Sequence, residues 1–173
     1  YMFWYADSFN QDIGGWDIRN VENISYIFWF AEAFNQNISD WKLNSVTEMM
    51  GVFYNAKSFN QNINSWDVSN ITDMRNMFTS AKAFDQDLDN WNVSNVTMMN
   101  QMFREAESFN QDIGNWDVSS VDDIANQANM DQMFYGATNF NQDLTDWCVS
   151  NISSEPTDFA LNSSLTNTNK PVW

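Results

Sequence analysis

The chain has 173 residues, with 7 basic and 23 acidic side chains, a formal net charge of −16 and no histidine. This charge argues against binding to nucleic acid or to anionic membrane surfaces. Without histidine, Ser-His and Cys-His nucleophile pairs and His-based metal sites are excluded. No apolar run approaches the ~20 residues needed to span a bilayer, so we expect no direct membrane insertion.

A 25-residue repeat organises the sequence. Its most visible column is tryptophan: Trp16, Trp41, Trp66, Trp91, Trp116 and, after a delay, Trp147. A phenylalanine column runs in parallel with it: Phe9, Phe34, Phe59, Phe84, Phe109 and Phe140. A fixed period of this size is typical of repeats that stack on one another around a shared core. The chain starts in mid-repeat, so we expect it to be part of a longer protein.

Each repeat divides into two predicted elements. Residues 66–68 alternate between apolar and polar side chains, which predicts a short strand paired in parallel with its neighbours. Apolar residues at 46, 49, 53 and 56 have the spacing of an amphipathic helix, and Ser45 with Glu48 forms a candidate capping box at its start. The sequence therefore predicts an α/β repeat solenoid with one short strand and one short helix per repeat.

Two departures from the period define the predicted domain organisation. Residues 1–152 form six coils, and about six extra residues near 125–130 are expected to be an insertion on the helical side. Residues 153–173 leave the repeat and are rich in Ser, Asn and Thr. We expect this tail to cap the stack and to prevent end-to-end association.

Polar columns recur at the predicted turns. Stacked Asn and Gln side chains are expected to bond to one another along the stack and to satisfy turn backbone. In the next column, Asp87, Asp112 and Asp143 are adjacent carboxylates that are weak candidates for a calcium site. Ordinary solvated turn aspartates are the favoured reading of these residues, and no other cofactor is expected.

The outward positions of the predicted strands vary from coil to coil. They are candidates for a binding face: Asp17, Lys42, Asp67, Asn92 and Asp117. The last member of this column is Cys148, the one cysteine of the chain. It is a candidate for a disulfide with a cysteine outside this segment, the alternative being a free thiol.

The motif Phe-Asn-Gln-Asp-Ile-x-x-Trp-Asp-Val-Ser-Asn-Val-Thr-x-Met, seen nearly whole at 59–74 and 109–121, resembles the repeat of the BspA-like surface protein family. That repeat also occurs in mycoplasma lipoproteins as a domain of unknown function. The resemblance implies a leucine-rich-repeat-like, right-handed coil and roles in adhesion. The closing segment, from Trp147 and Cys148 to Trp173, resembles the repeat terminus of flavobacterial surface proteins. This second resemblance implies a disulfide partner for Cys148 beyond Trp173 and export by the type IX pathway.

We therefore expect a non-enzymatic interaction or adhesion module that is secreted or displayed on the bacterial surface and contacts a protein or glycan. No acidic residue interrupts the repeat as a specialised glycosidase site would, so an enzyme is disfavoured. The alternatives are a carbohydrate-binding domain and a passive stalk. The aromatics outside the tryptophan column discriminate between them, since one flat exposed patch would favour glycan binding: Trp4, Trp29, Tyr54 and Tyr135.

Overall fold

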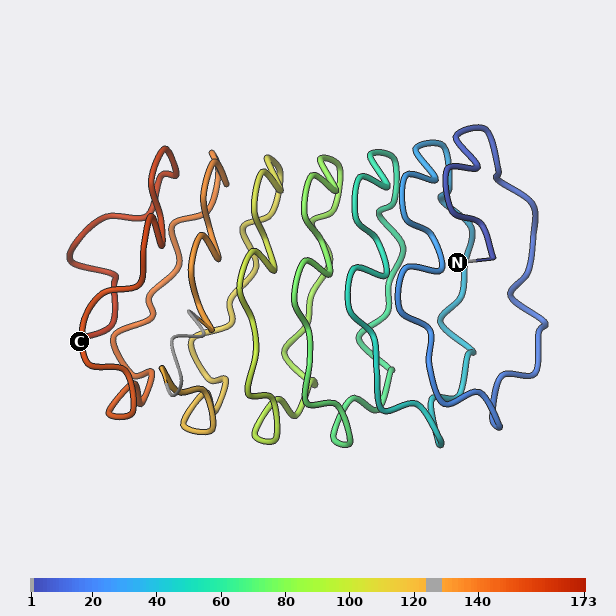
Figure 1. Ribbon diagram of the computed structural model, residues 1–173. Helices are drawn as coiled ribbons and strands as arrows, with labels where there is room; N and C mark the ends of the chain where they lie inside the picture. The colour runs from blue at the N-terminus through green and yellow to red at the C-terminus, as the bar shows by residue number, and fades with distance from the viewer. Residues whose placement is uncertain (1, 124–128) are drawn as a thin grey trace.

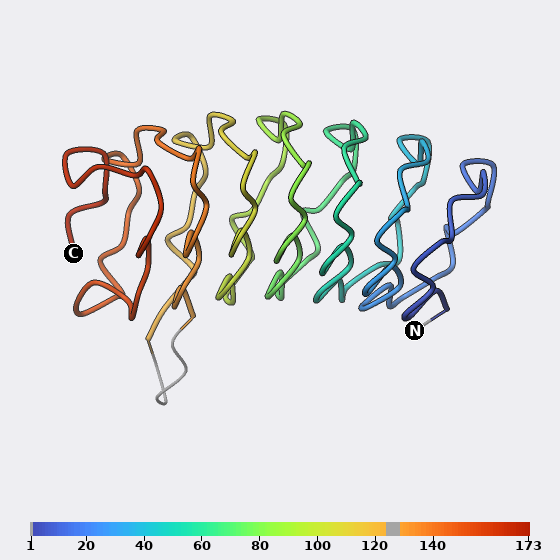
Figure 2. The same cartoon turned by 90° about the horizontal axis from the view of Figure 1, so that it is seen from above.

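The chain winds into similar coils that stack side by side in one row, with the two termini near opposite ends (Figure 1). The view from above shows the same row (Figure 2). This computed structural model describes residues 2–123 and 129–173. Most of the predicted insertion near 125–130 therefore lies outside the described residues.

The described residues contain no helix and no extended strand. Their β-type pairing is limited to isolated parallel bridges, which join equivalent residues of successive coils: Asn23 with Glu48, Glu48 with Asp73, and Asp73 with Met98. The prediction of an α/β repeat solenoid with one strand and one helix per repeat is therefore wrong. Trp66, Asp67 and Val68 do alternate between buried, exposed and buried positions, but they form no strand.

Left-handed backbone conformations prevent the predicted helix. An α-helix needs φ near −63° at every residue, whereas Gly51 and Asn55 have φ of +60° and +54°. The equivalent pairs in other coils, again four residues apart, are also left-handed: Tyr26 and Phe30, Asn76 and Ser80, Gln101 and Glu105, Gln132 and Gly136. Each segment is instead a series of tight turns.

Backbone hydrogen bonds in these turns run between coils. The N–H groups of Gly51, Phe53 and Asn55 donate to the carbonyls of residues 75, 77 and 79, at 2.9, 2.9 and 2.7 Å. Directly after them, the Ala56 N–H closes a turn on the Phe53 carbonyl within its own coil, at 3.0 Å. Donors and acceptors are thereby satisfied without a helix, while the predicted apolar stripe at 46, 49, 53 and 56 remains fully buried.

The tryptophan column lies in the core and links the coils. Trp66 is 2% exposed, stacks on Trp41 with ring centroids 6.3 Å apart, and donates from Nε1 to the Ile38 carbonyl at 3.1 Å. The same bond to the preceding coil is made by the other buried members: Trp41, Trp91, Trp116 and Trp147. Trp16, in the first coil, is the exception at 43% exposed.

The asparagine column forms the predicted polar ladder. The Oδ1 atom of Asn60 accepts from the Asp85 backbone N–H at 3.0 Å and from Gln86 Nε2 at 2.9 Å. Asn60 in turn donates its own N–H to Asn35 Oδ1 at 2.9 Å. This confirms that the ladder satisfies backbone N–H groups of the turns from coil to coil. Its last bond is donated by the Thr166 N–H to Asn141 Oδ1.

The segment 153–173 covers the last repeat. Its carbonyls at 157, 159 and 161 accept from the N–H groups of Gln132, Phe134 and Gly136 at 2.8–2.9 Å. Two of its own side chains, Phe159 and Leu165, are buried, at 1% and 7% exposure. The tail thus continues the stack as a further coil with different side chains.

Candidate functional site

The candidate calcium ligands are caps of their own turns. Asp87 and Asp112 accept from the backbone N–H two residues further on, each at 2.9 Å, and Asp143 accepts from both the N–H and the hydroxyl of Thr145. In the part of the chain that the structure describes, no group of three or more acidic, Cys or His side chains could hold a metal ion. No calcium site is assembled among these residues.

The candidate binding-face residues are all exposed, as expected of outward positions. Two open grooves at equivalent places on the stack are lined by three of them: Asp17, Lys42 and Asp117. One groove near the start combines Asp17 and Lys42 with Arg19 and Asp40. The other brings together the acidic candidates and the cysteine: Asp112, Asp117, Asp143 and Cys148.

Cys148 is exposed, and its thiol lies 3.7 Å from the Ser150 hydroxyl. It is a free cysteine in this structure. Its predicted disulfide stays a prediction.

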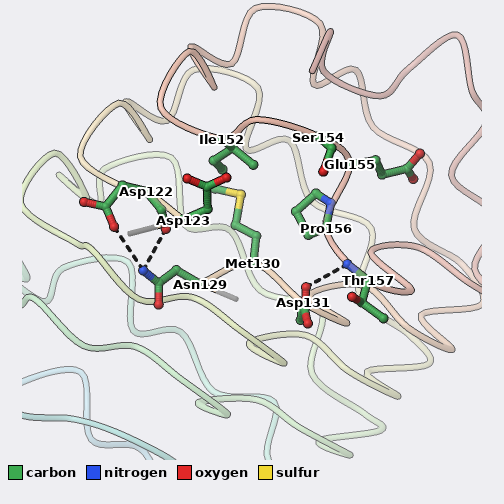
Figure 3. Close-up of a pocket in the computed structure, with 10 residues that line it drawn as sticks. All are labelled: Asp122, Asp123, Asn129, Met130, Asp131, Ile152, Ser154, Glu155, Pro156 and Thr157. Atoms are coloured by element: carbon green, nitrogen blue, oxygen red, sulfur yellow. Dashed lines mark hydrogen bonds between the residues drawn. The ribbon is translucent and has the colours of Figure 1, made fainter. Parts of the chain in front are cut away.

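An acidic pocket is lined by residues 122, 123 and 129–131 on one side and by residues 152 and 154–157 on the other (Figure 3). Asn129 Nδ2 donates to the Asp122 carbonyl at 2.7 Å, and the Thr157 N–H donates to Asp131 at 2.7 Å. The Ser153 N–H and hydroxyl both donate to Asp123, which lowers the pKa of that carboxyl. The Asp123 and Asp131 carboxylates thus hold the tail against the last repeat, which gives the pocket a structural explanation.

The most distinctive surface is a group of linked aromatic rings on the first three coils, which we call the aromatic patch. Its members are Trp4, Tyr5, Tyr26, Trp29, Phe30 and Tyr54. Trp29 stacks on Tyr54 with ring centroids 3.7 Å apart, and Tyr5 stacks on Phe30 at 4.6 Å. Trp4 and Tyr5 are more than half exposed, and the other four rings are partly exposed.

Local backbone geometry sets the positions of these rings. Tyr5, Tyr26 and Phe30 have φ between +56° and +60°, a conformation that bulky side chains rarely adopt. Later coils place small or polar residues at these turn positions, namely Asn76, Ser80, Gln101, Glu105 and Gly136. The repeat therefore does not require aromatics there.

Gly51 leaves space for two rings of the patch, those of Trp29 and Tyr26. A Cβ atom at this residue would lie 2.8 Å from the Trp29 ring and 2.9 Å from the Tyr26 ring. Any side chain here would displace these rings, because contacts under 3.0 Å require movement. The missing side chain of Gly51 allows the rings to pack over the turn.

A polar groove adjoins the patch through Tyr26. Its other lining residues belong to three successive coils: Asn23, Ser25, Glu48, Met50, Asp73 and Arg75. Arg75 forms a 2.6 Å ion pair with Asp73, and Asn23 Nδ2 donates to Glu48. The ion pair raises the pKa of Arg75 and fixes the planar guanidinium at the groove.

The four aromatics named from the sequence separate into two places. Trp4, Trp29 and Tyr54 belong to the patch, whereas Tyr135 lies under the Arg104 guanidinium, 4.6 Å from its ring centroid. Sequence reasoning missed Tyr5, Tyr26 and Phe30. The available signal was the loss of aromatics at the equivalent positions in later coils, where Asn, Ser, Gln and Glu appear.

The electrostatics of the acidic side chains do not favour proton donation. Every described carboxyl whose pKa is clearly shifted is shifted downward: Asp17, Glu32, Asp67, Asp117, Asp123 and Asp143. The Arg19 side chain lowers the pKa of Asp17 to about 2, and the Ser69 hydroxyl lowers that of Asp67. A general acid needs a raised pKa instead.

The chain belongs to the DUF285 family, described as Mycoplasma protein of unknown function. Three overlapping segments match the family, at residues 1–63, 30–128 and 61–173, and together they cover the whole chain. This agrees with the repeat read from the sequence. No curated protein and no solved structure matches the chain. No helix within the described residues is long and apolar enough to cross a membrane.

Proposed function

We propose that this chain is a non-enzymatic interaction module of a bacterial surface or secreted protein, and that the aromatic patch with its polar groove is the contact surface. One observation carries the proposal. Tyr5, Tyr26 and Phe30 occupy left-handed turn positions that favour small residues, and they remain partly or largely exposed. Bulky side chains rarely adopt this conformation, and the equivalent positions of later coils hold small or polar residues.

A passive stalk fits these features less well. Such a stalk needs only the buried columns and the inter-coil hydrogen bonds, and it gains nothing from exposed rings. Contiguous apolar surface also promotes association, so a surface-displayed protein retains it where it meets a ligand. The later coils carry small or polar residues at the left-handed positions that hold Tyr5, Tyr26 and Phe30, which supports a local role for the patch.

Catalysis is not part of the proposal. The sequence has no histidine, and hydrogen bonds from neighbouring side chains hold the shifted carboxyl pKa values below their ordinary range.

The extracellular setting is supported by the resemblance of the repeat motif to BspA-like surface proteins. The similarity of the closing segment to flavobacterial repeat termini supports export by the type IX pathway. Cys148 is exposed and therefore accessible to a disulfide partner beyond residue 173. Together these features favour display outside the cell, in an adhesion-type role.

The test is binding to an array that carries purified extracellular proteins and glycans. We expect the wild-type chain to be retained on at least one ligand, and a double variant, Trp29→Ala with Tyr54→Ala, to lose affinity. Removal of two central aromatic contacts costs about 2 kcal/mol or more, roughly 30-fold in affinity.

Tyr135→Ala is the matched control, because it removes a partly buried aromatic side chain outside the patch. It should bind like the wild type. Equal retention of the wild type and the double variant, or no retention of the wild type on any ligand, would reject the proposal.

A further inference from the structure

We propose that the aromatic patch and the adjoining groove bind a neutral oligosaccharide, an inference that rests on the proposed function and names its ligand class. The site pairs a group of partly exposed aromatic rings with a row of hydrogen-bonding side chains. A pyranose ring has a matching pair of surfaces, since its C–H groups form an apolar face and its hydroxyl groups form a polar rim.

The aromatic half of the site offers contact area for a ligand at a low cost in side-chain conformational entropy. Trp29 and Tyr54 are stacked at 3.7 Å with an interplanar angle of 11°, and Phe30 lies 5.5 Å from Tyr54. Because the rings already pack on one another, binding immobilises few side chains. Preorganised aromatics with few rotatable bonds gain affinity in this way.

The polar half supplies donors and acceptors beside the rings. Glu48 and Asn23 provide a carboxylate and an amide on adjacent coils, and Arg75 provides a planar donor fixed by Asp73. The Tyr26 hydroxyl reaches the same groove, 3.2 Å from the Met50 sulfur. Hydroxyl-rich ligands need both donors and acceptors, and this set contains both.

Charge narrows the ligand class. The groove has two carboxylates, on Glu48 and Asp73, against the single cation of Arg75, and the whole chain has a net charge of −16. Sialylated, uronic or sulfated glycans would be repelled by this field. Neutral glycans meet no such penalty, so they are the class that the site fits.

A glycine pair gives a test in which the backbone is preserved. Gly51→Asn keeps the left-handed conformation, which the equivalent residue Asn76 already adopts at φ +58°, but its side chain displaces the Trp29 and Tyr26 rings. The control is Gly136→Asn. This residue also has a positive φ, and there a Cβ would meet only Glu105, far along the stack, at 3.3 Å.

The probes are neutral gluco-, manno-, galacto- and chito-oligosaccharides, with sialylated and sulfated oligosaccharides as the charged set, titrated by calorimetry and by tryptophan fluorescence. We expect at least one neutral oligosaccharide to bind at millimolar or lower concentration. Gly51→Asn should weaken this binding about tenfold or more, and Gly136→Asn should leave it within about twofold. Glu48→Gln provides a second variant that alters the polar half without touching the rings.

Several outcomes overturn the inference. Binding of charged glycans alone contradicts the charge argument, and equal binding by the two glycine variants contradicts the assigned location. Patch-dependent binding of a protein with no response to any oligosaccharide rejects the glycan while the proposed function stands. If neither class of ligand binds, both proposals fail.

Discussion

Replacement of Trp66 by phenylalanine tests how the coils are held together. The indole is 2% exposed and donates from Nε1 to the Ile38 carbonyl at 3.1 Å. Phenylalanine keeps an aromatic ring but loses this hydrogen bond, worth about 1 kcal/mol. It also removes two buried carbons at about 0.8 kcal/mol each. We therefore expect a loss of about 2.5 kcal/mol.

That loss corresponds to a decrease in Tm of roughly 5–10 °C for a chain of this size. Differential scanning calorimetry measures it, with Trp16→Phe as the matched control. Trp16 is 43% exposed, and its Nε1 has no acceptor among residues 2–123 and 129–173. Its replacement should cost less than about 1 kcal/mol. Equal decreases for the two variants, or an unchanged Tm for Trp66→Phe, would refute the linking role of the buried indoles.

Three further predictions address the ladder, the carboxylates and calcium. Asn60→Ala removes the acceptor of two hydrogen bonds, so the free energy of unfolding measured by chemical denaturation should fall by about 2 kcal/mol. Asn60→Asp should retain most of the stability, because Asp85 fills the same role in the next coil. The Ser69 and Ser119 hydroxyls lower the folded-state pKa values of Asp67 and Asp117, respectively. These carboxylates therefore stabilise the fold at pH values above their ordinary pKa of about 3.9. That contribution is lost as the pH falls through the lowered pKa values. Calorimetry should show Tm decreasing between about pH 4 and pH 2, and less steeply in Asp67→Asn; an identical slope in this variant would argue against the assignment. Millimolar calcium should leave Tm unchanged, because the described carboxylates form no metal cluster, and an increase of several degrees would reverse that conclusion.

Much of the core could be predicted from the sequence. The 25-residue columns identify the buried residues because each coil places the same side chain above its equivalent in the next. Phe34 and Phe59, for example, stack at 5.9 Å with an interplanar angle of 4°. The period alone is enough to align such columns, whatever the backbone conformation between them.

The backbone conformation could not be predicted in the same way. Apolar residues at 46, 49, 53 and 56 bury one stripe in a helix, and successive four-residue turns bury the same stripe. Local sequence did not separate the two, because the left-handed positions hold Gly51 and Asn55 in one coil but Gln101 and Glu105 in another. Only the first pair is typical of left-handed turns.

The expected capping box was wrong for a related reason. Ser45 and Glu48 have the correct spacing for reciprocal bonds at a helix start. In the structure, Glu48 accepts from Asn23 of the preceding coil and forms parallel bridges with Asn23 and Asp73. In this fold the partner of a polar side chain is often 25 residues away, so short-range motifs lose their usual meaning.

The position of the aromatic patch is explained by a contrast between inward positions, which are fixed by the stack, and outward positions, which vary. Inward side chains must match their neighbours in the stack, which leaves little freedom to acquire a ligand site. The outward side chains of the left-handed turns need only support the backbone, and there the chain changes from Phe30 to Ser80 two coils later and to Glu105 in the coil after that. A protein built in this way can alter its binding surface by substitutions at a few turn positions while its core columns stay constant. We therefore propose that the outward positions where the repeat is least regular carry the contact surface, and the aromatic patch is such a departure in the described chain.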